Sequence, residues 1–233
     1  MKQKFKPTRK SAGVMLIVAE IIAGTFLSIS SFLLFLTLAR QIDSSLFLFD
    51  QSIVEYIYRL RSPLITNIMF ITTFFGGLSL LFFSAVIFFV LLIKKHKHEA
   101  VLFSLAFFTG FVINVVLKEY FARARPDISP LSLEILASFP SGHAMNSFVF
   151  YSFLVLLIHR LFKRKITTWA FGVVFSILVL LIGASRIYLG VHYPSDVVAG
   201  FVAAFFWAVT VLVIEKTLLI FSLTHKKRQQ LPH

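Results

Sequence analysis

The sequence predicts an all-α, polytopic membrane protein with six transmembrane helices, and three observations carry this prediction. Hydrophobic residues make up 58% of the 233 residues, and mean hydropathy is +0.88. Charged residues make up only 14%, whereas a soluble domain is usually about a quarter charged. Six mostly apolar stretches are long enough, or nearly so, to cross a bilayer core of about 30 Å, which takes about 20 residues per helix.

Each span ends where polar residues interrupt the apolar run. The predicted spans are Val14–Leu38, Leu64–Ile93, Ala100–Leu117, Ala144–Ile158 (continuing to Leu161), Ile166–Ser185 and Val197–Ile214. The first span is too long for the apolar core of a signal peptide, so it is kept as a membrane helix. Its one charged residue, Glu20, is expected to face a neighbouring helix. The pair Gly76-Gly77 in the second span indicates a kink or a close helix contact.

The segment between the first two spans is too short for another membrane helix. Its stretch Leu46–Leu60 (LFLFDQSIVEYIYRL) mixes apolar and charged residues at helical spacing. Such a pattern favours an amphipathic helix lying in the membrane interface. We therefore expect an interfacial helix in the first outer loop.

The basic residues predict the orientation. Because the number of spans is even, both termini lie on one side, and that side holds 16 of the 23 Lys and Arg. The seven on the other side are Arg40, Arg59, Arg61, Lys118, Arg123, Arg125 and Arg186. The positive-inside rule then places both termini in the cytoplasm. The formal net charge of +13 is thereby explained by helix ends that contact anionic lipids, and nucleic acid is not expected as a partner.

The predicted organisation is a basic cytoplasmic N-terminus (residues 1–13), one six-helix membrane domain (14–223) and a basic cytoplasmic tail (224–233). Cell-membrane localisation follows from the spans. There is no Cys, which excludes disulfides, thiolate nucleophiles and Cys-ligated metal centres.

We expect the functional residues at the outer ends of the helices. Of the seven His, only two lie there, together with three cations and one carboxylate. These residues are His143, His192, Lys118, Arg125, Arg186 and Asp196. Polar groups at membrane depth are costly and tend to be functional, so we expect a site that processes an anion.

The first segment of this candidate site reads KEYFARARP and begins at Lys118. If the third span continues as a helix, Lys118 and Arg125 lie two turns apart on one face, and Pro126 ends the helix. The alternative is a rim of basic side chains that reach the interface. Arg123 falls off that face and is expected in the rim, while Glu119 stays unassigned.

The second segment, FPSGH, opens the fourth span. Ser141 is a good helix N-cap, and Gly142 lets the backbone approach a ligand closely. A helix N-terminus favours a bound phosphate, beside which His143 could act as a general acid. An ordinary helix cap with an interfacial His is the alternative.

The third segment, SRIYLGVHYPSD, leads into the sixth span. Pro194 suits the first helical turn, which puts His192 just before the helix and Asp196 inside it. A carboxylate within reach of one imidazole nitrogen would fix the tautomer and leave the other nitrogen free to attack. A purely structural His–Asp capping pair is the alternative. Gly190 permits a tight bend.

Together the three segments read K-x6-R-P, P-S-G-H and S-R-x5-H-x3-D. In this order they closely resemble the tripartite signature of the type 2 phosphatidic acid phosphatase family, in its integral-membrane branch. The resemblance covers about residues 64–220. The matching positions are Lys118, Arg125, Pro126, Pro140, Ser141, Gly142, His143, Ser185, Arg186, His192 and Asp196.

The resemblance implies a role for each residue. His192 would be the nucleophile that forms a phosphohistidine, with Asp196 orienting it and His143 protonating the leaving oxygen. The phosphoryl oxygens would be held by Lys118, Arg125, Ser141, Gly142 and Arg186. No metal and no other cofactor is expected.

The resemblance and the site residues together lead us to expect a metal-independent lipid phosphate or diphosphate phosphatase at the outer membrane face, acting on phosphatidylglycerophosphate, phosphatidic acid and related lipids. An undecaprenyl-diphosphate phosphatase that recycles the cell-wall carrier lipid is the alternative. A non-catalytic lipid-phosphate transporter is a second alternative, although binding alone needs no oriented nucleophile. Residues of the Glu119–Ser138 loop, Glu134 among them, could tune headgroup choice.

Overall fold

The computed structural model describes residues 9–42 and 45–228, and within them it contains helices and no strand. The helices are α1 (Arg9–Arg40), α2 (Ser45–Arg59), α3 (Pro63–Phe74), α4 (Ser79–Ile93), α5 (Lys97–Phe121), α6 (Gly142–Phe162), α7 (Lys165–Tyr188) and α8 (Pro194–Arg228). Six helical segments in the described residues are long and apolar enough to cross a membrane, with α3 and α4 counted as one. The predicted fold class is confirmed. The predicted terminal segments lie partly outside the described residues.

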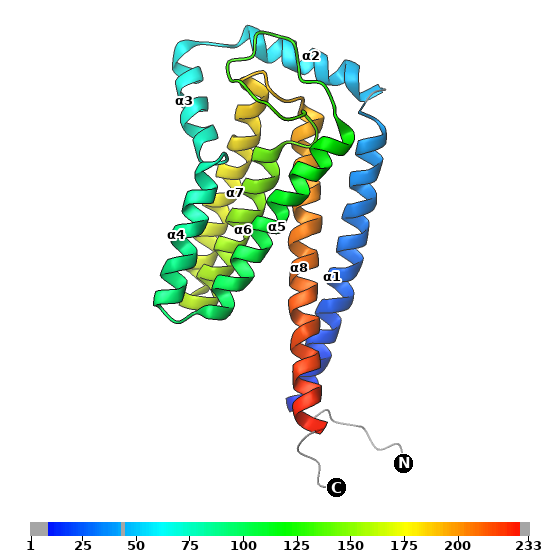
Figure 1. Ribbon diagram of the computed structural model, residues 1–233, viewed down its shortest axis with the longest axis vertical. Helices are drawn as coiled ribbons and strands as arrows, with labels where there is room; N and C mark the ends of the chain where they lie inside the picture. The colour runs from blue at the N-terminus through cyan, green and yellow to red at the C-terminus, as the bar shows by residue number, and fades with distance from the viewer. Residues whose placement is uncertain (1–8, 43–44, 229–233) are drawn as a thin grey trace.

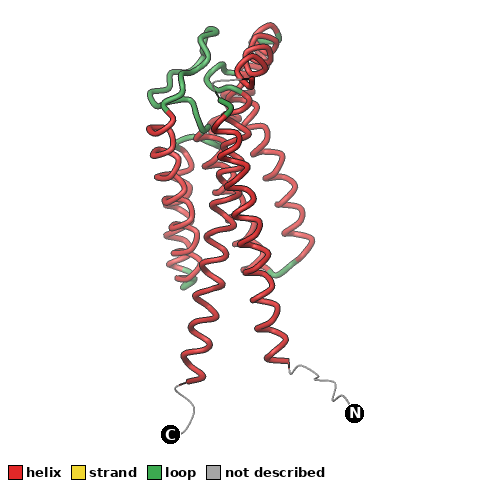
Figure 2. Tube along the Cα trace, turned by 90° about the vertical axis from the view of Figure 1, so that its right-hand side faces the viewer, coloured by secondary structure: helices red, strands yellow, loops and turns green. Residues whose placement is uncertain are grey.

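The long helices run along a common axis, and α2 lies across one end of the bundle (Figures 1 and 2). We call this end the α2 end and the opposite one the far end. Helix α6 packs against α5, α7 and α8, while α1 packs along α8. The predicted interfacial helix is therefore present as α2. Loop 122–141 gathers at the same end as α2, above the ends of α5 to α8 (Figure 1).

The second predicted span is broken between Phe74 and Ser79. Both interpretations of the glycine pair at this break are correct, because the helix is interrupted and the packing is close. A Cβ on Gly76 would overlap Cγ2 of Ile182, and a Cβ on Gly77 would lie 3.0 Å from Nε2 of His143. The break therefore brings the backbone close to a candidate site residue, His143, where a side chain in place of Gly77 would be crowded.

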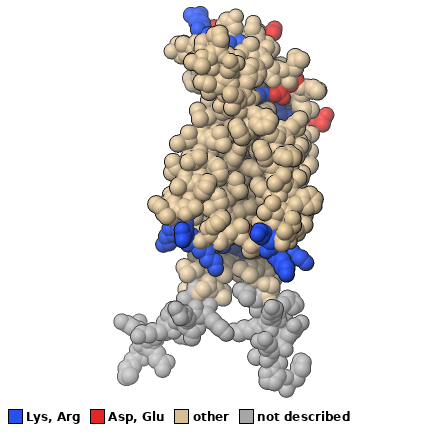
Figure 3. All heavy atoms as spheres, turned by 90° about the vertical axis from the view of Figure 1, so that its left-hand side faces the viewer, with Lys and Arg blue, Asp and Glu red and all other residues tan. Residues whose placement is uncertain are grey.

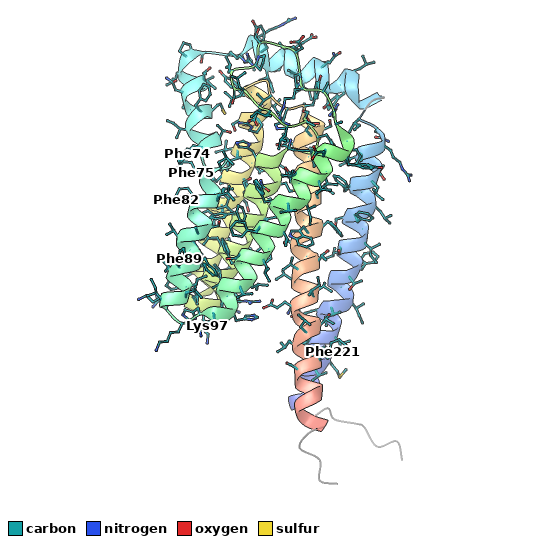
Figure 4. All side chains as sticks on the ribbon, in the orientation of Figure 1. Phe74, Phe75, Phe82, Phe89, Lys97 and Phe221 are labelled. Carbon is teal, nitrogen blue, oxygen red and sulfur yellow. The ribbon has the colours of Figure 1, made fainter. Side chains whose placement is uncertain are left out.

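The outer surface of the bundle is apolar between its two ends. Phe82 and Phe89 on α4 point away from the other helices (Figure 4) and are 66% and 61% exposed. Figure 3 shows Lys and Arg at the far end, charges of both signs at the α2 end, and a face without charges between them. This distribution is that of a membrane protein whose apolar side chains contact lipid.

Three charged residues well inside the spans near the far end, Glu20, Glu215 and Lys216, are paired. Lys216 on α8 donates to Glu20 on α1, so the expectation that Glu20 faces a neighbouring helix is correct. Glu215 accepts two hydrogen bonds of 2.7 Å from Arg160 and one from His98. These contacts tie α8 to α1, α5 and α6, away from the candidate site.

Candidate active site

The structure brings the sequence-predicted site residues together at the α2 end. Each comes from the end of a helix or from a loop beside it. Lys118 lies in the last turn of α5, Arg125 in loop 122–141, Ser141, Gly142 and His143 at the start of α6, Arg186 in the last turn of α7, His192 just before α8, and Asp196 in its first turn.

The path of the chain after Lys118 differs from the prediction. Helix α5 ends at Phe121, where Ala122 adopts a left-handed conformation with φ of 45°, so Arg125 is not on a shared helix face and Pro126 does not end the helix. Both cations still reach the site because loop 122–141 folds back over it. Lys118 donates to the carbonyl of Ala137 at 2.5 Å, and Arg125 donates to the carbonyl of Leu136 at 2.8 Å.

The expectation for Arg123 was wrong. Arg123 is 6% exposed, not a rim residue, because its guanidinium lies between two buried carboxylates. It donates to Asp196 at 2.5 Å and to Asp50 of α2 at 2.9 Å. Helical spacing in the sequence could not predict these ion pairs, because Asp50 and Asp196 each lie 73 residues from Arg123 in the chain.

His192 is held by one nitrogen. Its Nδ1 lies 3.3 Å from Oδ2 of Asp196, and the same oxygen accepts from the hydroxyl of Ser138 at 2.5 Å and from the amide of Tyr193 at 2.9 Å. Its Nε2 lies 3.3 Å from Nη1 of Arg125. The hydrogen-bond network thus assigns the proton to Nδ1 and leaves the Nε2 lone pair directed toward the cations.

The protonation of His192 follows from its burial. Burial lowers the pKa of His192 to about 3, although the hydrogen bond and charge of Asp196 act in the opposite direction. Burial also lowers the pKa of Arg125, while Glu134 and Asp196 partly offset this effect. The imidazole is therefore neutral near pH 7, which is the form with a free lone pair.

Arg186 is the most deeply buried of the three cations, at 1% exposure. Its Nη1 donates to the hydroxyl of Thr73 at 2.6 Å, and its Nη2 is paired with Glu134. Its buried Nε has no partner among the residues the structure describes. A buried donor without an acceptor costs free energy, so this N–H is suited to an oxygen of a bound ligand.

The N-terminus of α6 completes the site. The hydroxyl of Ser141 caps the helix by accepting from the amide of Ala144 at 3.5 Å. A Cβ on Gly142 would lie 2.8 Å from Oδ1 of Asn114 and 3.5 Å from Cε of Lys118. Gly142 therefore lets the helix end pack closely against Asn114 of α5, beside Lys118, and the N–H groups of a helix N-terminus favour an anion there.

Within residues 9–42 and 45–228, no group of three or more His, Cys, Asp or Glu side chains is placed so that it could coordinate a metal ion. The carboxylates of the site are each paired with a guanidinium. That no metal takes part in the chemistry remains a prediction.

Several functional candidates were missed by the sequence reasoning. They are Asp50, Thr73, Ser138 and Ser195, and each reaches the site through a contact between distant segments. Ser138 lies in a loop without a periodic pattern. The sequence around Asp50 indicated an amphipathic helix but gave no indication that Asp50 faces the site. Glu134 was one of four loop residues, with Asp127, Ser129 and Ser132, expected to tune headgroup choice, and its contact with Arg186 puts it beside the cations.

A six-span bundle with three clustered cations, two His and an oriented carboxylate at one end defines an integral-membrane phosphatase. Residues 99–219 match the PAP2 superfamily. The chain is 35% identical over 179 residues to phosphatidylglycerophosphatase B of Bacillus subtilis, covering 74% of this chain and 87% of that one. It is also 33% identical over 135 residues to lipid A 1-phosphatase of Rhizobium johnstonii, covering 53% of this chain and 51% of that one.

A solved structure agrees with these sequence matches. The crystal structure of a transmembrane PAP2-type phosphatidylglycerolphosphate phosphatase from Bacillus subtilis superposes with a TM-score of 0.78 at 30% identity, covering 82% of this chain and 97% of that one. The chain therefore belongs to the PAP2 superfamily. It is a multi-pass membrane phosphatase of the kind whose relatives hydrolyse lipid phosphate esters.

Proposed function

We propose that the chain is a metal-independent phosphatase of phosphatidylglycerophosphate, phosphatidic acid and related lipids that acts through a phosphohistidine. One observation carries the proposal: Nδ1 of His192 is held by Asp196, while Nε2 is directed toward Arg125. A neutral imidazole fixed in one tautomer beside cations is suited to attack phosphorus. The relative and the solved structure from Bacillus subtilis, both described as phosphatidylglycerophosphate phosphatases, support the first substrate.

In the first half-reaction, the phosphoryl oxygens bind Lys118, Arg125 and Arg186 near the start of α6. Nε2 of His192 attacks phosphorus, a nitrogen–phosphorus bond forms, and the bond from phosphorus to the lipid oxygen breaks. His143 gives its proton to that leaving oxygen. Fixed cations stabilise the charge on the phosphoryl oxygens in the transition state, which is the main catalytic effect available for this transfer.

In the second half-reaction, the neutral His143 accepts a proton from water as the water oxygen attacks phosphorus. The nitrogen–phosphorus bond breaks, inorganic phosphate is released, and His192 is neutral again. Asp196 stabilises the positive imidazole ring while the phosphohistidine exists.

The side of the membrane is part of the proposal. The excess of Lys and Arg at the far end (Figure 3) supports cytoplasmic termini and a site at the outer face. Because the chain has no Cys, single-Cys variants in the exposed part of loop 122–141 can be labelled with an impermeant maleimide. We expect labelling of intact cells, and labelling only after lysis would reverse the orientation.

The mechanism is tested by phosphate release from lipid phosphate in detergent. His192→Ala should abolish turnover, whereas Asp196→Asn should leave a residue of activity because it misorients the nucleophile without removing it. EDTA should have no effect, and vanadate should inhibit as a phosphoryl mimic. Full inactivation by EDTA with rescue by Mg²⁺ would refute the metal-free mechanism, and binding without phosphate release would favour a transporter.

The substrate is tested by comparing kcat/KM across a panel. The site offers cations for phosphoryl oxygens between apolar helices, so weak discrimination among lipid tails is expected. We expect overlapping activity on phosphatidylglycerophosphate, phosphatidic acid and undecaprenyl diphosphate, with soluble phosphate esters much poorer. Efficient hydrolysis of glucose 6-phosphate without activity on any of the three lipids would contradict the lipid assignment.

A further inference from the structure

The carboxylate of Asp196 uses its two oxygens differently. Oδ2 faces His192 and accepts from Ser138 and from the amide of Tyr193. Oδ1 points away from the nucleophile and accepts from Nη1 of Arg123 at 2.5 Å. The orientation of Asp196 toward His192 therefore depends on a residue outside the family signature.

Arg123 is itself fixed from the other side by the helix that crosses the bundle end. Its Nη2 donates to Asp50 of α2 at 2.9 Å and to the carbonyl of Ile42 at 3.1 Å. Its guanidinium lies 4.4 Å from the ring centroid of Tyr193. Burial on its own lowers the pKa of Arg123, but the charges and hydrogen bonds of Asp196 and Asp50 raise it overall, so the guanidinium stays charged.

Asp50 is fully buried, at 0% exposure, although it lies on a helix whose other charged residues face outward. It accepts from the amide of Ser195 at 3.0 Å and from the hydroxyl of the same residue. A buried carboxylate is costly unless it is paired and hydrogen-bonded. Ser195 supplies the hydrogen bonds to Asp50, and Arg123, which Asp50 shares with Asp196, supplies the opposite charge.

The sharing has an electrostatic consequence for the nucleophile. An isolated pair of Arg123 and Asp196 would be neutral and would stabilise a positive imidazole weakly. With Asp50 added, two carboxylates share one guanidinium and carry a net charge of −1. This charge lies in a buried region, where it interacts strongly with the positive charge that His192 acquires on bonding to phosphorus.

We propose that Asp50 and Arg123 are positioning residues for phosphoryl transfer, through which α2 holds Asp196 on His192 and keeps a net negative charge beside it. The inference rests on the proposed function, because it concerns the charge that develops on His192 as nucleophile. It also gives α2 a part in catalysis besides its place at the membrane interface.

The main test is Asp50→Asn, which keeps the shape of the side chain and removes its charge. We expect kcat to fall about tenfold to hundredfold, with KM within about twofold, because the charge on His192 develops only after substrate has bound. The matched control is Glu55→Gln, which removes an exposed carboxylate from the same helix and should leave kcat unchanged.

A double-variant comparison separates positioning from general structural support. If Asp50 acts largely through Asp196, adding Asp50→Asn to Asp196→Asn should lower kcat by a clearly smaller factor than Asp50→Asn does alone. Independent effects would multiply, and that result would overturn the proposal. If Asp50→Asn does not give folded protein, Arg123→Lys keeps the cation but cannot contact both carboxylates as the guanidinium does. It should lower kcat through the loss of positioning and show the same non-additivity with Asp196→Asn.

The failure of this inference is distinguishable from failure of the proposed function. Substantial activity of His192→Ala would refute the histidine nucleophile and this inference with it. An inactive His192→Ala together with an Asp50→Asn variant as active as Glu55→Gln would leave the proposed function in place and refute the role of α2.

Discussion

Arg123 and Arg125 lie two residues apart, yet they belong to two charge clusters of opposite composition. The anchor cluster consists of Asp50, Arg123, Ser195 and Asp196, and its one cation is matched by two carboxylates. The substrate cluster consists of Lys118, Arg125 and Arg186. Two of its three cations, Arg125 and Arg186, share one carboxylate, Glu134. A guanidinium between carboxylates stabilises the fold, whereas cations left mainly with carbonyl oxygens can still bind an anion.

His192 lies between these clusters, since Nδ1 contacts Asp196 of the first and Nε2 contacts Arg125 of the second. In the proposed mechanism, the substrate cluster would attract the phosphoryl group toward Nε2, and the anchor cluster would stabilise the positive ring that results. The comparison teaches that counting carboxylates around each cation distinguishes a structural Arg from a substrate-binding one, even within a single short loop.

The largest effect is expected from Arg186→Ala. Losing a cation that faces the phosphoryl group should lower kcat/KM by roughly 10²- to 10³-fold. Phosphate release by purified protein in detergent measures it, with Arg61→Ala as control, because Arg61 donates to the carbonyls of Tyr188 and Ser129 outside the substrate cluster. A loss of less than tenfold would remove Arg186 from the substrate cluster.

A large effect on stability is expected from Arg123→Ala. It leaves Asp50 and Asp196 buried without their cation, so the free energy of unfolding should fall by about 3–5 kcal/mol. Arg125→Ala should cost less, because it removes hydrogen bonds to the carbonyls of Leu136 and Val191 but leaves no fully buried carboxylate without its cation. Denaturant titration in detergent compares the two variants, and equal losses would abolish the distinction between the clusters.

The neutral state of His192 predicts how stability depends on pH. Burial lowers the pKa of His192 to about 3 in the folded protein, from an ordinary value of 6.5. Between these two pH values, the unfolded chain therefore binds a proton at His192 that the folded chain does not bind. The contribution of His192 is therefore complete above pH 6.5 and is lost as pH falls toward 3, by up to about 1.4 kcal/mol per pH unit. His192→Asn should flatten this slope in thermal unfolding between pH 6.5 and 4.5, and an unchanged slope would contradict a neutral His192.

The smallest effect is expected from Glu134→Gln. Glu134 is partly exposed and pairs with Arg186, so it competes with a phosphoryl group for the same N–H groups. Its neutralisation should lower the inhibition constant of vanadate up to about fivefold. Asp127→Asn, an exposed carboxylate of the same loop, is the control. Weaker inhibition in the Glu134 variant would mean that the carboxylate supports the site and does not compete.

The features that could be predicted from the sequence are those determined by residues close together in the chain. Hydropathy is local, so the six spans were found, and Ser141 and Pro194 marked the starts of α6 and α8 correctly. The path of loop 122–141 could not be predicted, because its shape comes from Lys118 and Arg125 binding its own carbonyls. The anchor cluster was missed because its ion pairs join distant segments, and no local pattern separates Arg123 from a rim residue.

The pairing of α1 with α8 has a consequence for biosynthesis. The hydroxyls of Ser28 and Thr210 lie 2.7 Å apart although 182 residues separate them in the chain, and Asp50 reaches Ser195 across 145 residues. Helix α1 therefore enters the bilayer long before the translation of the helix it packs along. His192 and Asp196 lie only four residues apart, so both reach Arg123 and Asp50 together when α8 inserts. A ribosome-bound chain therefore has no complete site until its last helix is in place.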